Sequence, residues 1–382
     1  MVRSGINFWK IREKSSIIKY GPGKARTFYL RGQRAERTCL HAHSATAAKP
    51  EKLAERVSFG FIKANRKTAA GRTYLGLFPL GKSPSGKGMG IKMRVTEIVE
   101  AKKRAGKPVL SFEIFPPKKE EALKNIDATL ERLCDLHPDF ISVTFGAGGS
   151  AVDNQTVELA KKIKNNYGVE PIVHLTCLHY GKEEIAVILA QLKEAGIENV
   201  LALRGDVNPN VPVKNDFKYA NELVGYIKSQ GDFHISGACY PETHLEAPDA
   251  ITDIHNLKKK VDAGVTHLVS QLFFDNEAFY RFYEKTRIAG INVPVEAGIM
   301  PVTNRAQIER MVNICGATLP PKFERILHKY ENNKEALFDA GMAYAVNQIV
   351  DLIANDVDGI HIFTMNNSKV AGRICDSIRN LI

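Results

Sequence analysis

The chain has 382 residues, of which 44% are hydrophobic and 25% charged, the balance of a globular protein with a sizeable core. No apolar run is long enough to span a bilayer, so the composition argues against a membrane protein. The net charge of +11 comes from one end, because residues 1–92 hold 20 Lys and Arg against 4 Asp and Glu, whereas the rest holds 33 and 38. Chain-wide basicity, a common mark of nucleic-acid binding, is therefore excluded.

Residues 1–92 form a basic segment in which hydrophobic residues keep neither period two nor period 3.6 for long. We expect a largely disordered extension. A transit peptide or a nucleic-acid arm is the alternative, but the segment lacks a sustained amphipathic helix and interleaved aromatic residues. Ordinary globular sequence begins near Met89 and Met93, so upstream sequence translated in error explains the segment best. We therefore assign one catalytic domain to residues 93–382.

The six cysteines are scattered without a CxxC pair, so neither a disulfide framework nor a structural zinc site is indicated. No cluster of His, Asp and Glu has the spacing of metal ligands either. We expect reduced thiols, no bound metal and a cytoplasmic protein.

Beyond Met93 the sequence repeats a short apolar run followed by a longer stretch with helical spacing. Eight runs are predicted to be strands: Val109–Phe115, Phe140–Phe145, Pro171–Leu175, Asn199–Leu203, His234–Tyr240, His267–Leu272, Val293–Ile299 and Gly359–Thr364. The predicted helices include Asn154–Lys164, Glu183–Ala195, Ile251–Ala263 and Glu277–Ala289, several of which close on a glycine.

Strands that are apolar on both faces and separated by helices favour parallel pairing. Eight of them in this length predict an α/β protein of the (β/α)8 TIM-type barrel, with a doubly wound sheet as the alternative. The longer gap between Met300 and Asp358 has room for two extra helices before the last strand, around Pro321–Tyr330 and Glu335–Ala354.

Glu113 stands inside the first predicted strand, in the run Leu110-Ser-Phe-Glu-Ile-Phe-Pro-Pro117. Burial raises the pKa of a carboxyl group, so such a residue can hold a proton near neutral pH and act as a general acid. The two prolines end the strand and place Glu113 close to a loop. A carboxylate neutralised by a structural partner is the alternative.

Polar residues stand at the carboxyl ends of nearly all eight predicted strands, where barrel enzymes carry their catalytic groups. We expect these residues to line one cavity. They are Glu113, Thr144 with the glycine turn 146–149, His174 with Thr176, Arg204-Gly205-Asp206, Tyr240 with Glu242 and His244, Gln271, and Asn366-Asn367.

Arg204-Gly205-Asp206 leaves a buried strand with a glycine that lets backbone approach a ligand, while the arginine offers a fork of donors to an anion. A turn with an internal ion pair is the alternative. Asp253, Asn256 and Lys260 share one helical face, which by itself is typical of a solvated surface. No GxGxxG follows a strand and no lysine stands in mid-strand, so the residues alone indicate a cofactor-using barrel with one general acid.

The motifs taken together resemble methylenetetrahydrofolate reductase of the short bacterial type, from about Met93 to the C-terminus. They are Ser111-Phe-Glu113 with Phe115-Pro-Pro117, Ser142-Val-Thr144, His174-Leu-Thr-Cys177, Leu203-Arg-Gly-Asp206, Tyr240-Pro-Glu242 with His244, Gln271-Leu-Phe-Phe-Asp275, and Gly298-Ile-Met-Pro301.

The resemblance implies a homo-oligomeric enzyme that reduces methylenetetrahydrofolate, with FAD reduced by NADH or NADPH. By carry-over, Glu113 would be the general acid, Asp206 would tune the flavin and hold the pterin, and Thr144, Gln271 and Gln307 would contact the folate. Residues implied for FAD are Thr144, His174, Arg204, Gly205, Asp206, Ala220, Tyr240, His244, Asp253, Asn256 and Lys260.

Two positions depart from the family pattern. Met311 stands where a Phe can meet the nicotinamide and folate rings, and Asn367 stands where an Arg can reach the folate. Another flavin-dependent barrel oxidoreductase is the competing enzyme, and a scaffold with a nucleic-acid arm is the competing non-enzyme.

Overall fold

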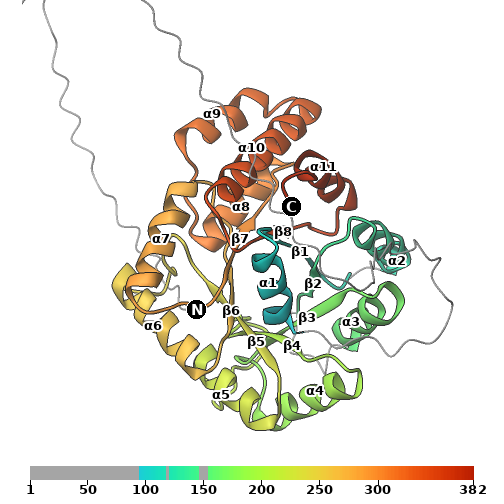
Figure 1. Cartoon of the computed structure of the whole chain (residues 1–382), viewed down its shortest axis with the longest axis vertical. Helices are drawn as coiled ribbons and strands as arrows, with labels where there is room; N and C mark the ends of the chain where they lie inside the picture. Colours follow the sequence, from blue (N-terminus) through green and yellow to red (C-terminus); the bar gives the residue numbers. More distant parts are fainter. Residues whose placement is uncertain (1–93, 118–119, 146–153) are drawn as a thin grey trace, which may run out of the picture. The chain divides into compact units, whose positions relative to one another are not determined.

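The computed structural model describes residues 94–117, 120–145 and 154–382. Eight parallel strands pair in sequence order and close into a barrel, as predicted (Figure 1). The strands are β1 Val109–Ile114, β2 Phe140–Val143, β3 Glu170–Thr176, β4 Asn199–Leu203, β5 His234–Cys239, β6 His267–Ser270, β7 Val295–Ile299 and β8 Gly359–Phe363. The predictions for residues 1–92 and for the glycine turn at 146–149 fall outside the described residues.

Helices follow the strands and surround the barrel (Figure 1). They are α1 Val95–Arg104, α2 Glu120–Cys134, α3 Asn154–Tyr167, α4 Lys182–Glu194, α5 Ala220–Gln230, α6 Ala250–Ala263, α7 Asn276–Ile288, α8 Arg305–Cys315, α9 Pro321–Tyr330, α10 Lys334–Ala354 and α11 Ser368–Ile378. Within the described ranges, none of these helices is long and apolar enough to cross a lipid bilayer.

The core lies on both faces of the strands, which is why the strands read as continuous apolar runs. All five residues of β7 are buried, and the helices pack an apolar stripe against the outer face. Helix α1 covers the amino-terminal end of the barrel, where Val95 and Val99 join a buried cluster with Phe140 and Leu201. The N–H of Val95 donates to Asn199 Oδ1 at 3.1 Å, so this end of the barrel is closed.

The predicted strands and the observed ones agree within a few residues. Strand β7 starts at Val295 and not at Val293, because Pro294 has no N–H to give to the ladder. The extra helices predicted before the last strand are confirmed as α9 and α10, which follow α8. Strands β2 and β6 end earlier than predicted. The last residues predicted for each strand therefore belong to the loop at the carboxyl end of the barrel.

Helix α10 lies so close to the loop after β7 that only glycine fits at one position. A Cβ on Gly341 would lie 1.8 Å from the carbonyl oxygen of Val302, which is backbone and cannot rotate away. By contrast, a Cβ on Gly225, on the exposed side of α5, would meet no atom within 4 Å.

These two glycines form a matched pair for a stability test. We expect Gly341→Ala to lower the free energy of unfolding by about 1–3 kcal/mol or more, because the backbone must shift. Gly225→Ala should raise it by about 0.5–1 kcal/mol, because alanine favours a helix interior. Urea unfolding followed by circular dichroism measures both, and equal effects of the two substitutions would contradict the packing of α10.

Candidate active site

Two adjoining cavities lie over the carboxyl ends of the strands. The first has a volume of about 540 Å³ and the second about 410 Å³. Both are lined by Leu203, Arg204, Ala238, Tyr240 and His244. Since they share these residues, the two cavities form one elongated site, which we call the outer cavity (toward α6) and the inner cavity (over the barrel axis).

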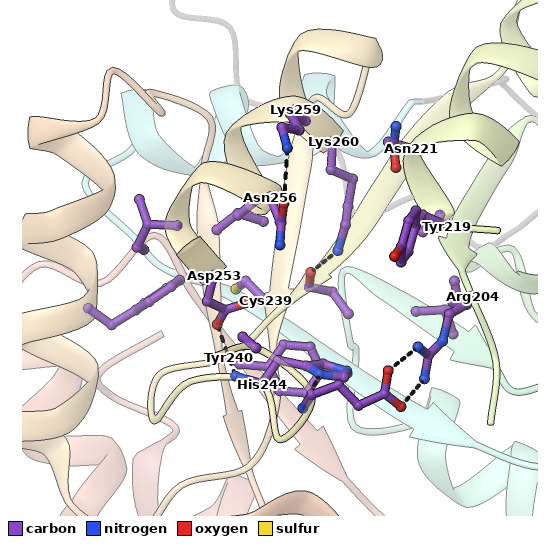
Figure 2. Close-up of a pocket in the computed structure, with 18 of the residues that line it drawn as sticks. Arg204, Tyr219, Asn221, Cys239, Tyr240, His244, Asp253, Asn256, Lys259 and Lys260 are labelled. Atoms are coloured by element: carbon purple, nitrogen blue, oxygen red, sulfur yellow. Dashed lines mark hydrogen bonds and ion pairs between the residues drawn. The ribbon is translucent and has the colours of Figure 1, made fainter. Parts of the chain in front are cut away.

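The outer cavity is lined by the helical face predicted from sequence. Asp253, Asn256 and Lys260 of α6 all face it (Figure 2). Ala220 at the start of α5 also lines it. All three α6 residues therefore line the outer cavity, although Asn256 remains exposed. The structure brings them together with Arg204, Tyr240 and His244 in one wall.

Lys260 is a partly buried cation at this wall. Its ammonium donates to the carbonyl oxygen of Ala238 at 2.7 Å (Figure 2), and burial lowers its pKa. A neutral carbonyl meets only part of the cost of burying a charge. The geometry therefore favours an anionic group of a ligand beside Lys260.

Arg204 and Gly205 form the turn that leaves β4. Gly205 has a φ of 87°, and a Cβ there would lie 3.0 Å from Cβ of Thr176, so the backbone passes where a larger residue would not fit. The Arg204 guanidinium makes a two-pronged ion pair with Glu246, one prong being 2.7 Å between Nη2 and Oε1 (Figure 2). Glu246, and not the adjacent Asp206, is the partner.

Tyr240 and His244 stack edge to face between the two cavities, with ring centroids 4.6 Å apart. The backbone N–H of His244 donates to Asp253 Oδ2 at 3.0 Å, which ties the loop after β5 to α6. Burial, and then the negative charge of Asp206, raise the pKa of Tyr240 to about 12. Its hydroxyl therefore stays protonated and remains a hydrogen-bond donor at neutral pH.

Glu113 forms the floor of the inner cavity, between two buried histidines. Its Oε2 lies 3.7 Å from His174 Nε2 on β3 and 3.7 Å from His361 Nε2 on β8. The Glu113 side chain is 22% exposed, whereas the two histidine side chains are 7% and 2% exposed. Of these three side chains, the Glu113 carboxylate is thus the one that a ligand in the cavity can reach.

The pKa of Glu113 is shifted in the direction opposite to the one expected from the sequence. Burial raises its pKa, but the contact with His361 and the positive charges that His174 and His361 carry when protonated outweigh burial, so the pKa lies below its ordinary value. Burial also lowers the pKa of His174 to about 4, which leaves that ring neutral at pH 7. In the ligand-free barrel, a role of Glu113 as a general acid therefore cannot rest on a raised pKa.

Most of the other predicted residues line the inner cavity, namely Thr144, His174, Gly205, Asp206, Gln271 and the departing residue Met311. Gln307 and Asn367 line neither cavity. Gln307 lies in the first turn of α8, where its N–H donates to the cap residue Asn304 at 3.3 Å. Asn367 is exposed and caps α11 through Val370 N–H, also at 3.3 Å.

Sequence reasoning missed His361 and Glu246. His361 has no local motif, and only its pairing with Ser111 across the barrel seam brings it to Glu113. Glu246 lies just after Tyr240-Pro-Glu242 and His244, and this position could have drawn attention to it. Its partner Arg204 lies 42 residues away in the chain, so nothing in the local sequence indicated the ion pair. Met365 and Phe363 also line the inner cavity.

A closed parallel barrel with polar side chains converging on a cavity at the carboxyl ends of its strands defines a (β/α)8-barrel enzyme. The family model for methylenetetrahydrofolate reductase matches residues 98–379. The chain belongs to the methylenetetrahydrofolate reductase family.

Known proteins similar to this chain include bacterial and plant members of that family. The chain is 35% identical over 273 residues to 5,10-methylenetetrahydrofolate reductase of Pectobacterium carotovorum, covering 72% of this chain and 91% of the relative. It is 36% identical over 294 residues to methylenetetrahydrofolate reductase (NADH) 1 of Arabidopsis thaliana, covering 73% of this chain and 50% of the relative. The chain thus spans about half the length of the plant relatives it matches.

One solved structure shares the fold at low sequence identity. It is an uncharacterized protein from Clostridium thermocellum that binds two copies of 5-methyl-5,6,7,8-tetrahydrofolic acid. The TM-score is 0.55 at 14% identity, with 76% of this chain and all of that chain covered.

The low pKa of His174 predicts a pH dependence of stability. The folded-state pKa is about 4, against about 6.5 in an unfolded chain. Between these values the unfolded chain binds the extra proton, so the free energy of unfolding falls as the pH drops from about 6.5 to about 4. His174→Asn should reduce that slope by up to about 1.4 kcal/mol per pH unit.

Urea unfolding at several pH values between 4.5 and 6.5 measures the slope. His255→Asn is the control, because His255 lies exposed on α6 outside both cavities. Identical slopes for the wild type and His174→Asn would show that the ring takes up its proton in the folded protein.

Proposed function

We propose that this barrel reduces 5,10-methylenetetrahydrofolate to 5-methyltetrahydrofolate, with FAD as the bound carrier and NADH or NADPH as the electron donor. Family membership supports the reaction class. The observation that carries the proposal is the position of Glu113, a reachable carboxylate between two buried histidines at the floor of a cavity that continues into a cation-lined one.

The outer cavity suits the anionic half of FAD. The partly buried ammonium of Lys260 and the guanidinium of Arg204 are the groups that would meet its phosphates. Asp253, Asn256, Ala220 and Tyr240 with His244 would hold the rest, while Thr144, His174, Gly205 and Asp206 would surround the ring system in the inner cavity. Bound FAD would supply hydride transfer in both directions, which no side chain can do.

The side chains of the inner cavity would handle the folate. Glu113 would deliver a proton to the bridging nitrogen of methylenetetrahydrofolate, which opens the five-membered ring. Asp206 would hold the pterin, and Gln271 would contact both the folate and the nicotinamide. Gln307 would reach the folate only by extending from the first turn of α8, since it does not line the cavity.

Three further parts complete the proposal. The donor would be NADH or NADPH, and the plant relatives carry NADH in their names. Residues 93–382 would form the catalytic domain. The enzyme would be cytoplasmic and homo-oligomeric, as the family resemblance implies.

The FAD site can be tested by removing the charge of Lys260. Lys260→Met should weaken FAD binding about tenfold to a hundredfold, since a hydrogen bond to a charged group contributes about 1.5–3 kcal/mol. Lys258→Met is the control, because Lys258 lies on the same helix but pairs with Asp262 outside the cavity. Flavin absorbance of the purified proteins and fluorescence titration with FAD measure the difference. A colourless wild type that cannot be reconstituted would refute the flavin proposal.

The acid step can be tested with Glu113→Gln, which keeps the size of the side chain but cannot donate a carboxyl proton. Reduction of the flavin by the nicotinamide needs no acid, so bleaching should stay within about tenfold of the wild type, whereas reoxidation by methylenetetrahydrofolate should slow by about 10² or more. Anaerobic stopped-flow absorbance separates the two half-reactions.

The contrasting substitution is Asp206→Asn, which should change both half-reactions because Asp206 would touch both the flavin and the folate. If Glu113→Gln were reoxidised at nearly the normal rate, or lost both halves equally with FAD still bound, Glu113 would be a structural carboxylate.

A further inference from the structure

A row of buried polar side chains continues from Glu113 into the barrel interior. His361 faces Glu113 with Nε2, and its other ring nitrogen, Nδ1, lies 2.7 Å from Ser111 Oγ. The Ser111 hydroxyl in turn donates to Oε2 of Glu296 on β7 at 2.5 Å. A second carboxylate is thus linked to the first through one hydroxyl and one imidazole.

The row ends on β6 and β5. His267 Nε2 lies 2.7 Å from Glu296 Oε1, and Ser236 Oγ lies 2.9 Å from His267 Nδ1. Ser111, Glu296, His361, His267 and Ser236 are each at most 1% exposed.

A carboxylate at this depth is costly unless other groups meet its charge. Glu296 receives the Ser111 hydroxyl on one oxygen and contacts the His267 ring with the other. An apolar side chain would fill the same space at lower cost, and barrel interiors are usually filled that way. The position of Glu296 therefore indicates a role beyond packing.

The hydrogen count of the row fixes where the protons sit. A serine hydroxyl has one hydrogen to donate. Because Ser111 donates it to Glu296, Ser111 can only accept from His361, so His361 carries its proton on Nδ1. The Nε2 atom then turns its lone pair toward Glu113, where a second proton can be shared.

We propose that Glu296, acting through Ser111, holds the Nδ1 proton of His361 in place, so that His361 and Glu113 keep the proton of the acid step as a pair. This inference rests on the proposed function. It also accounts for an acid step at a carboxyl group whose own pKa lies below its ordinary value. Glu296 is a positioning residue, because it touches neither cavity.

The chemistry of the step balances within this pair. One proton leaves the pair and joins the bridging nitrogen of the folate, the bond between that nitrogen and the methylene carbon breaks, and its electrons stay on the nitrogen. The methylene carbon would then accept a hydride, which bound FAD would supply. The pair is left as a carboxylate and a neutral imidazole, and solvent returns the proton before the next turnover.

The charges around the pair determine the direction of the expected pH effect. His361 is faced by Glu113 of β1, by His174 of β3, which is neutral at pH 7, and by Glu296 through Ser111. Glu296 is itself faced by His267 and influences Asp139, which pairs with Lys102 at 2.9 Å. Glu296→Gln removes only the negative charge of Glu296. The pair then holds its shared proton less tightly, because losing that proton leaves the pair with a net negative charge.

The first test is the pH profile of Glu296→Gln in the flavin-loaded protein. As the pH rises, the rate of flavin reoxidation by methylenetetrahydrofolate should begin to fall at a lower pH than in the wild type. The midpoint of that fall should shift down by about one pH unit, the typical effect of removing a nearby opposite charge. Bleaching by NADH should keep its rate and its profile. Stopped-flow absorbance between pH 6 and 9 measures both.

The control is Thr286→Val, which removes a buried hydroxyl on α7 that donates to the Tyr283 carbonyl at 2.6 Å and has no part in the row. It should leave both profiles in place. An unchanged midpoint in Glu296→Gln, or an equal loss in both half-reactions, would overturn the proposal. A wild type that methylenetetrahydrofolate cannot reoxidise would refute the proposed function instead.

The second test needs no turnover and no folded Glu296 variant. In ¹⁵N-histidine-labelled wild type, the His361 signals are those that disappear in His361→Asn, and nitrogen–proton couplings show which ring nitrogen carries the proton. A proton on Nδ1 at neutral pH supports the proposal. A proton found only on Nε2 would overturn it, whatever the kinetics of the variants show.

Discussion

Pairing of the first strand with the last closes the barrel, and the same pairing builds the active site. In its register Ser111 stands opposite His361, and Glu113 stands opposite Phe363. Gly359 opens this seam, where a Cβ would lie 2.8 Å from Cγ of Glu296 and 2.9 Å from Cβ of Val109. A slip of one residue would turn His361 out of the barrel, so closure and catalysis depend on one register.

The interior of the barrel combines two demands that usually conflict. An apolar filling gives stability, whereas a proton held near a substrate needs polar groups out of contact with water. Here the polar residues form a continuous row, so that most of them have a polar neighbour within 3 Å. Other buried polar side chains, among them Ser142, His174 and His234, stand outside this row, so the polarity of the barrel is not confined to the β1–β8 seam.

Much of the fold was predictable because it depends on local patterns. Eight apolar runs, their helical spacers and the closing glycines such as Gly264 are properties of short stretches, and each corresponds to an observed element. Strand β7 starts later than predicted, since Pro294 gives the ladder only its carbonyl oxygen, which accepts from the N–H of Leu268 at 2.9 Å. The polar residues at the strand ends were also predictable, because they directly follow the strands in the sequence.

The site was less predictable because its electrostatics come from distant parts of the chain. Burial of Glu113 was visible from its neighbours in sequence, and burial alone predicts a raised pKa. The opposite direction comes from His174 and His361, which lie 61 and 248 positions further along the chain and reach Glu113 only when the barrel closes. Likewise the family resemblance implied a folate contact for Gln307, but this residue lies in the first turn of α8 and lines neither cavity.

The ion pair between Arg204 and Glu246 has a thermodynamic consequence for whatever anion comes to Arg204. The guanidinium is already oriented by a carboxylate whose side chain is 59% exposed, so an arriving phosphate replaces one anion by another and releases Glu246 to water. Little rotational freedom of the arginine is then lost on binding. Because the phosphate takes over a contact that Glu246 already makes, the net electrostatic gain is smaller than at an unpaired cation, so the affinity should fall less steeply with ionic strength.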